Sequence, residues 1–101
     1  MKLVILKYLR DDEACVDRLL AESRVAVYSR LDVEGVAPGG AAGWYGARAP
    51  YASEMIITIV PDDAASVLLE AVAECRDVQD PRHPIRALQL RVERETACRC
   101  D

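Results

Sequence analysis

The sequence contains no phenylalanine, and its aromatic residues are limited to four tyrosines and one tryptophan among 101 residues. Any core must therefore be built mainly from Val, Leu, Ile and Ala. No apolar run approaches the roughly 18 residues that a membrane-spanning helix needs, and Lys and Arg form no basic stripe. With a formal net charge of −4, the chain is expected neither to bind nucleic acid nor to insert directly into a membrane.

Other signals are missing as well. The start of the chain lacks the cleavage site of a secretory signal, so a cytoplasmic location is expected. Four cysteines without an export signal do not indicate a disulfide framework, and Cys15 and Cys75 are expected as small core residues on apolar helix faces. The single histidine, His83, has no activated Ser or Cys beside it. We expect it on a loop surface, with contact to a ligand in a cleft as the alternative, and we expect no enzyme.

Apolar periodicity divides the chain into six elements. The expected strands cover residues 2–9, 25–34, 54–60 and 85–94, and the expected helices cover about 12–23 and begin again at Asp62. Asp11 or Asp12 is expected to cap the first helix, and Asp62 the second. The expected buried stripes are Cys15, Val16, Leu19 and Leu20 in the first helix, Val67, Leu68, Ala71, Val72 and Cys75 in the second, and Val25, Val27, Leu31 and Val33 in the second strand.

This βαββαβ order predicts a single α+β domain over residues 1–101 with the ferredoxin-like fold, in which a four-stranded antiparallel sheet carries two helices on one face. Strands 2–9 and 54–60 are apolar on both alternating sets of side chains, which is typical of strands covered on two sides. The two helices can cover only one side. Self-association is therefore expected to bury the other side.

A long connection, residues 36–53, separates the second and third strands. It holds four glycines, two prolines and three aromatic residues and shows no apolar periodicity. Structureless connections longer than about 12–15 residues are uncommon in compact domains unless they are functional or disordered. Trp44, Tyr45 and Tyr51 are suited to anchor the loop in a partner, and Arg48 is suited to an acidic groove. The alternative is that Trp44 and Tyr45 fold back on the sheet as an apolar lid.

Three segments resemble those of the PII signalling proteins. The run Ile-Val-Pro-Asp-Asp, from Ile59 to Asp63, is similar to the junction between the third PII strand and the second helix. Val33-Glu34-Gly35 resembles the entry to the PII T-loop, and Tyr45-Gly46-Ala47 resembles a segment further along that loop. The resemblance extends over residues 1 to about 95.

The resemblance implies a homotrimer with three clefts between its subunits. In the family each cleft accepts an adenine nucleotide, sometimes with a small anion, and the T-loop binds a transporter or an enzyme. The chain lacks the family's glycine-rich basic segment after the second helix, because residues 75–84 contain neither Gly nor Lys. The effector that we expect is therefore ADP or AMP, together with bicarbonate, rather than ATP.

The effector-binding residues expected from this resemblance are Gly35, Gly39, Gly40, Arg82, Arg86 and Arg99. The partner-binding residues expected in the loop are Trp44, Tyr45, Arg48 and Tyr51. The expected partner is a membrane transporter or a cytoplasmic enzyme complex. The first hypothesis is thus a regulatory, signal-transduction protein that requires no cofactor.

The C-terminal tail, residues 95–101, carries a second hypothesis. Cys98 and Cys100 are two residues apart, so on an extended tail both sulfurs point the same way and can bind one copper or zinc ion or pair as a strained disulfide. Two thiolates leave a metal site half-built unless a neighbouring subunit or His83 completes it. This alternative is a metal-handling protein similar to the CutA type. The other alternative is an inert, disordered tail. A third hypothesis is a small isomerase or monooxygenase of ferredoxin-like fold.

Overall fold

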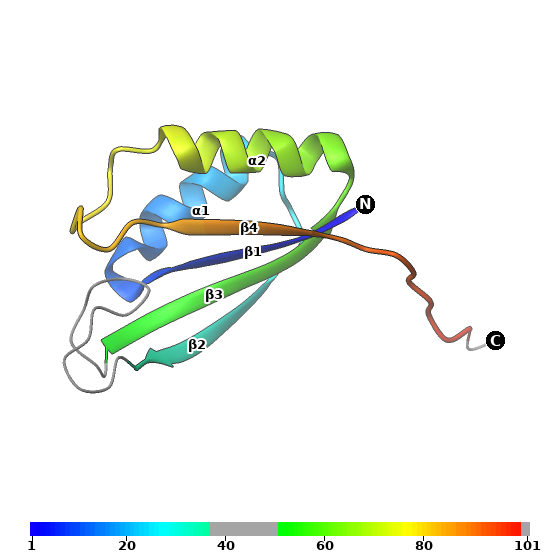
Figure 1. Cartoon of the computed structure of the whole chain (residues 1–101), viewed down its shortest axis with the longest axis horizontal. Coiled ribbons are helices and arrows are strands. Elements are labelled where there is room, and N and C mark those ends of the chain that lie inside the picture. Colours follow the sequence, from blue (N-terminus) through cyan, green and yellow to red (C-terminus); the bar gives the residue numbers. More distant parts are fainter. Residues whose placement is uncertain (37–50, 100–101) are drawn as a thin grey trace.

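A computed structural model describes residues 1–36 and 51–99 of the chain, with Tyr51 described by its backbone alone. The strands are β1 (Lys2–Leu9), β2 (Ser29–Gly35), β3 (Tyr51–Val60) and β4 (Arg86–Arg91). A single 3-10 turn, η1 (Arg10–Asp12), continues directly into helix α1 (Glu13–Glu22), and the second helix is α2 (Asp62–Glu74). The predicted βαββαβ order is confirmed (Figure 1).

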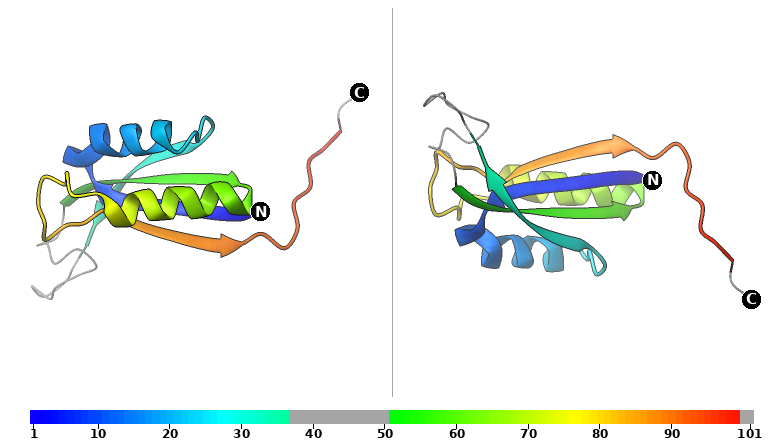
Figure 2. Two further views of the ribbon diagram at one scale, coloured as in Figure 1. Left: turned by 90° about the horizontal axis from the view of Figure 1, so that it is seen from above. Right: turned by 90° about the horizontal axis from the view of Figure 1, so that it is seen from below.

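The four strands form one antiparallel sheet in the order β2-β3-β1-β4. The central strands β1 and β3 pair along the whole of β1, from Lys2 opposite Val60 to Leu9 opposite Ser53. Both helices lie on the same face of the sheet (Figure 2, left). The predicted α+β, ferredoxin-like arrangement is therefore confirmed, while the trimer stays a prediction.

The core lies between α1, α2 and the sheet, and it is aliphatic as predicted. Val4, Leu6 and Tyr8 of β1 are fully buried, because alternate residues of a strand point to the same face. Tyr8 is the one buried aromatic side chain among the described residues. The stripe predicted for the first helix packs against these strand residues and comprises Cys15, Val16, Leu19 and Leu20.

Helix α2 contributes a narrower stripe than predicted. Ala65 and Leu68 are buried, and Ala71, Val72 and Cys75 pack partly buried against the core. Val67 was predicted to be buried but is 52% exposed. The reason is the helical period, which turns Val67 about 100° away from Leu68. Neither described helix has the length and apolar content to cross a membrane.

A polar network begins at the buried hydroxyl of Tyr8 and extends to the surface. The Tyr8 hydroxyl donates a hydrogen bond of 2.9 Å to Glu54 Oε1 of β3. Glu54 is only 3% exposed and lies 3.5 Å from the Arg30 guanidinium of β2. Arg30 also pairs with Glu13 and Asp17 of α1. Burial raises the pKa of the Tyr8 hydroxyl, so this group remains a donor to the carboxylate. These contacts join β1, β2, β3 and α1. They also supply the partners without which burial of the Glu54 carboxylate would be costly in free energy.

The opposite face of the sheet, which we call the open face, carries no described helix (Figure 2, right). By the strand register its apolar side chains are Leu3, Ile5, Leu9, Leu31, Val33, Met55, Ile57, Ile59, Leu88 and Leu90. Leu31 is 42% exposed, Ile59 47%, Leu88 41% and Leu90 51%. Large contiguous apolar surfaces of this kind are uncommon on monomeric proteins.

The prediction of a strand from residue 25 is wrong, because β2 begins at Ser29. Helix α1 ends in a left-handed residue, Arg24, with φ 60°. The amides of Arg24 and Val25 donate to carbonyls of the last helical turn over 3.1 and 2.9 Å, which is the Schellman motif. The amide of Val25 therefore belongs to the hydrogen bonds that end the helix and not to a strand. Val27, predicted on the apolar face of the strand, is 83% exposed.

Neither predicted aspartate cap forms. Asp12 occupies the N-cap position of α1, but its side chain makes no capping hydrogen bond. Its Oδ1 atom accepts instead from the Gln79 amide over 2.8 Å. Pro61 is the N-cap residue of α2, and Asp62 Oδ1 accepts from the N-terminal amino group over 2.5 Å. This hydrogen bond lowers the pKa of Asp62. Asp12 thus binds a distant amide instead of capping, and Asp62 lies one residue past the N-cap position.

The third and fourth strands also differ from their predicted bounds. β3 begins at Tyr51 rather than at residue 54, because Tyr51 pairs with Gly35 and extends the β2–β3 ladder. The connection predicted over 36–53 is therefore shorter at its C-terminal end, where residues 51–53 belong to β3. β4 ends at Arg91 rather than at residue 94. Arg91 pairs with Lys2, the first residue of β1, and beyond the strand the Val92 amide donates to the Met1 carbonyl over 3.2 Å.

Replacing Arg24 with glycine is expected to stabilise the protein. A left-handed non-glycine residue costs roughly 1–2 kcal/mol, and the extra freedom of glycine in the unfolded chain cancels about half of the gain. Arg24→Gly should therefore raise the thermal midpoint by about 4 °C, whereas Arg24→Ala, which keeps a Cβ atom, should not. Calorimetry at one protein concentration compares the two. A glycine variant no more stable than the wild type would contradict the helix-end assignment.

Candidate functional site

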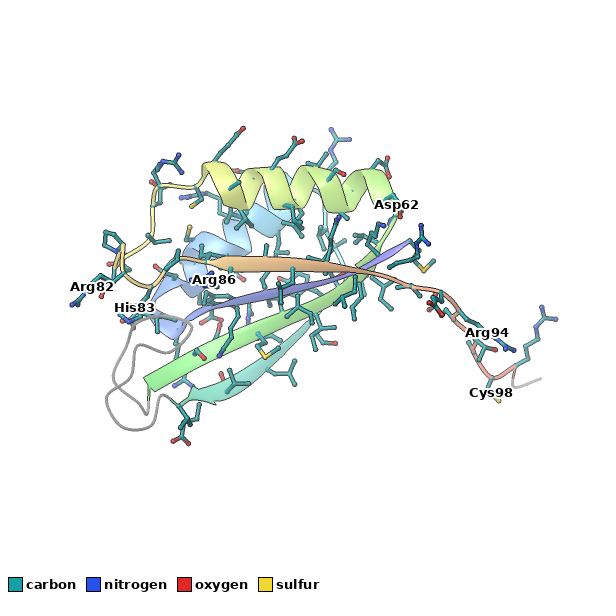
Figure 3. The ribbon with its side chains drawn as sticks, in the orientation of Figure 1. Asp62, Arg82, His83, Arg86, Arg94 and Cys98 are labelled. Atoms are coloured by element: carbon teal, nitrogen blue, oxygen red, sulfur yellow. The ribbon has the colours of Figure 1, made fainter. Side chains whose placement is uncertain are left out.

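Several predicted site residues lie at one end of the sheet, which we call the loop end. There β1 and β2 end, at Leu9 and Gly35, and β3 and β4 begin (Figure 1). The loop between α2 and β4, residues 75–85, reaches the same end. Figure 3 shows Arg82 and His83 at this end, with Arg86 following in β4.

Helix α1 holds the first part of this loop in place. Arg18 Nη2 donates to Asp77 Oδ2 over 2.6 Å. The Asp12 carboxylate, 1% exposed, accepts from the Gln79 amide over 2.8 Å. Ile85, which is buried, returns the chain to the core just before β4. The path of the loop is therefore determined by α1 and by the core rather than by the loop sequence alone.

The tip of the loop is a tight turn whose side chains pair with one another. Arg82 Nε and Nη2 donate to the two carboxylate oxygens of Asp80 over 3.2 and 3.1 Å. His83 Nδ1 lies 2.9 Å from Asp80 Oδ2, and the His83 amide donates to the Asp80 carbonyl over 2.8 Å. The hydrogen bonds from Arg82, followed by the one from His83, hold the pKa of Asp80 well below its usual range.

The prediction that His83 lies on the surface is wrong, because this residue is 7% exposed. Its bond to Asp80, three residues earlier, keeps the ring against the protein. Arg82 is exposed, but its charge is offset by Asp80, so an anionic ligand would compete with this carboxylate. The signal available in the sequence was the spacing of Asp80, Arg82 and His83, which suits a turn closed by its own side chains.

The sequence prediction missed Lys7. In the β1–β4 ladder Lys7 lies opposite Arg86. Both belong to the open face, because Ala87, on the alternate set, packs against the core. The open face therefore carries two cationic residues on adjacent strands at the loop end. The available signal was one lysine in a set of alternating strand residues that is otherwise apolar, with Ile5 and Leu9 on either side.

A hollow of about 440 Å³ lies between α2 and the outer edge of β4. Its lining consists of Leu69, Val72, Ala73, Pro84, Ile85, Arg86, Ala87 and Leu88. Arg86 is the one charged residue among these described residues, and the others are apolar. By the strand register the Arg86 side chain belongs to the open face, so the hollow on the helix side of the sheet is lined by apolar side chains.

The predicted effector residues are only partly brought together within one chain. Arg82 and Arg86 share the loop end, and Gly35 lies at the same end on the opposite edge strand. Arg99 belongs to the tail, which leaves the other end of the sheet (Figure 1). The remaining predicted residues, Gly39, Gly40, Trp44, Tyr45, Arg48 and Cys100, lie outside the described residues, as does the side chain of Tyr51.

Within residues 1–36 and 51–99, no three or more His, Cys, Asp or Glu side chains cluster so that they could hold a metal ion. Cys98 is exposed, and it lies at the opposite end of the molecule from His83 (Figure 3). His83 of the same chain therefore does not complete a site with Cys98. A metal site at Cys98 and Cys100 stays a prediction.

Acid titration tests the paired turn. Because Arg82 and His83 favour its charged form, the Asp80 carboxylate stabilises the fold above its ordinary pKa of about 3.9, and this stabilisation is lost as the pH falls through the lower folded pKa. In NMR spectra the Asp80 carboxyl carbon should titrate well below pH ~3.9. Arg82→Ala should return the midpoint toward this value, and Arg76→Ala should not. An ordinary midpoint in the wild type would contradict the pairing.

No model of a protein family matches the chain, and no curated protein matches it. Among solved structures, CPII from Thiomonas intermedia K12, a nitrogen regulatory PII-like protein bound to ADP, AMP and bicarbonate, is 20% identical over 94% of each chain, with a TM-score of 0.59. The PII-like protein CutA from Nostoc sp. PCC 7120, in apo form, is 17% identical over 92% of this chain and 82% of its own, with a TM-score of 0.64. A candidate PII-like signaling protein from Thermus thermophilus is 18% identical over 88% of this chain and 83% of its own, with a TM-score of 0.62. These similarities establish the fold: the chain has the PII-like form of the ferredoxin-like fold.

Proposed function

We propose that this chain is a divergent PII-like regulatory protein, not an enzyme, that acts in the cytoplasm as a homotrimer. Its clefts between subunits bind ADP or AMP together with bicarbonate. Its loop 36–53 then controls a membrane transporter or a cytoplasmic enzyme complex. The observation that carries the proposal is the open face, an apolar surface that ends in two cationic residues.

The open face supports association of several copies. Fully burying a Leu or Ile side chain contributes about 1.5–3 kcal/mol. Leu31, Ile59, Leu88 and Leu90 each retain about half of their exposure, between 41% and 51%, so each offers on the order of 1 kcal/mol upon burial. The four lie on three different strands, so one flat partner surface can cover them together.

The loop end supports an effector of low charge. Lys7 and Arg86 place two cations side by side at the rim of the open face, where a neighbouring copy would enclose them. Arg82 contributes little to the binding of an anionic effector, because Asp80 already offsets its charge. CPII, which has a similar fold, is bound to ADP, AMP and bicarbonate. This similarity of fold supports the choice of these ligands.

The position of the loop supports its control by the effector. Gly35 pairs with Tyr51, so both ends of the connection leave the sheet together at the loop end. In the proposal Gly35, Gly39 and Gly40 approach the effector with Arg82, Arg86 and a neighbouring copy's Arg99. The partner is contacted by Trp44, Tyr45, Arg48 and Tyr51. A ligand that binds one arrangement of this loop better than another shifts the loop toward that arrangement.

Solution mass tests the assembly. The wild-type protein at micromolar concentration should have three times the 11.1 kDa mass of one chain in light scattering after size exclusion. Ile57→Glu places a charge at the centre of the open face and should yield a single-chain mass. Val67→Glu places the same charge on an exposed position of α2 and should leave the trimer intact. A wild-type mass equal to one chain would contradict the proposal.

Calorimetric titration tests the effector. ADP or AMP, with bicarbonate present, should bind the wild-type protein, and Arg86→Ala or Lys7→Ala should weaken binding about 10-fold to 100-fold, since a charge-assisted hydrogen bond contributes about 1.5–3 kcal/mol. Arg82→Ala should have a smaller effect because Asp80 already pairs with Arg82. Arg91→Ala, at the other end of β4, serves as the matched control. The absence of heat with ADP, AMP, ATP and bicarbonate would contradict the effector model.

A further inference from the structure

Two cysteines distant in sequence meet on the helix side of the sheet. Cys15 Sγ of α1 and Cys75 Sγ, at the end of α2, are 3.5 Å apart, and both are free thiols. The sequence predicted both as small core residues on apolar helix faces. We propose that Cys15 and Cys75 form a redox-active pair that closes reversibly into a disulfide bond within one chain.

The geometry requires only a small movement. A disulfide bond is about 2.05 Å long, so the sulfurs must approach by roughly 1.5 Å from their separation of 3.5 Å. Cys75 is the C-cap residue of α2, with extended backbone angles of φ −68° and ψ 133°. It is therefore outside the regular helix, and a local adjustment there leaves the hydrogen bonds of the helix interior in place.

The two thiols differ in access. Cys75 is half-buried and lines a surface hollow of about 420 Å³, whose other lining residues include Arg18 and Arg76. Cys15 lies deeper, at 9% exposure. Burial raises the pKa of the Cys15 thiol to about 11, although Arg18 Nη2 is 3.8 Å from its sulfur and opposes this effect. Cys75 is consequently the thiol that a small oxidant reaches first, and Cys15 is the thiol that attacks second.

The oxidant in this proposal is a low-molecular-weight disulfide. The Cys75 thiolate attacks one sulfur of the oxidant, breaks its S–S bond and releases one half as a thiolate, while the other half stays bonded to Cys75. Cys15 then loses its proton to water, and its sulfur attacks the Cys75 sulfur and releases the second half. In total two protein thiols lose two protons and two electrons, and the oxidant is reduced to two thiols.

Closure would fix the start of the loop 75–85 covalently. This segment is already held to α1 by the Arg18–Asp77 pair at 2.6 Å and by the Gln79 amide on Asp12 at 2.8 Å. A bond between Cys15 and Cys75 adds a third, covalent connection at the same place. The redox pair goes beyond the proposed function and does not depend on it, because it concerns α1 and the end of α2 alone.

The experiment uses the full chain with Cys98→Ser and Cys100→Ser, so that only Cys15 and Cys75 remain as thiols. After incubation with oxidised glutathione, maleimide labelling and intact mass should show both thiols lost, no glutathione retained and no cross-linked chains, and dithiothreitol should restore both. The thermal midpoint should rise by about 10 °C in the oxidised form, and amide exchange at residues 77–79 should slow.

Two controls keep the result interpretable. Adding Cys75→Ser should leave Cys15 unlabelled by glutathione and the midpoint unchanged by oxidant. Adding Cys15→Ala instead should trap glutathione on Cys75. In the wild-type chain, peptide mapping of the oxidised protein should recover a Cys15–Cys75 cross-linked peptide. Persistence of two free thiols, a stable glutathione adduct on Cys75 with Cys15 free, or bonds only between chains would overturn the proposal.

Discussion

The central strands β1 and β3 carry apolar side chains toward both faces of the sheet, and the two helices pack on only one face. The covered face, with Val4, Leu6 and Ile56 fully buried, forms the core. The open face, with Ile59 and Leu90 about half exposed, has no cover among the described elements. Because apolar burial is the dominant favourable term in folding and association, this imbalance is the constraint from which the proposed assembly follows.

The loop end gathers polar groups on both faces of the same strand. Tyr8 points into the core and donates to Glu54, while its neighbour Lys7 belongs to the open face beside Arg86. Arg30 extends this network from the buried Glu54 to an exposed carboxylate of α1. The connection between β2 and β3 leaves the sheet at this same end, which is why ligand and loop are linked in the proposed mechanism.

Much of the fold could be predicted from periodicity, but the element ends could not. Residues 2–9 were assigned correctly because, apart from Lys2 and Lys7, the side chains of β1 are apolar on both alternating sets. Val25 was misassigned because its apolar side chain fits a strand, whereas its amide completes the end of α1. Asp12 and Asp62 have the chemistry of caps, but each binds a distant group instead. Of the candidate site, Arg86 was predicted and its neighbour Lys7 was not, since their pairing depends on strand order.

By itself the sequence determined the order of the elements, the aliphatic character of the core and the two-sided apolarity of β1 and β3. These properties depend on residues a few positions apart, whose relation follows from the period of a helix or a strand. The tertiary structure alone decided which distant residues meet, including Lys7 with Arg86, Asp12 with Gln79, and Cys15 with Cys75. Such meetings depend on how helices and strands pack together, and no local period contains that information.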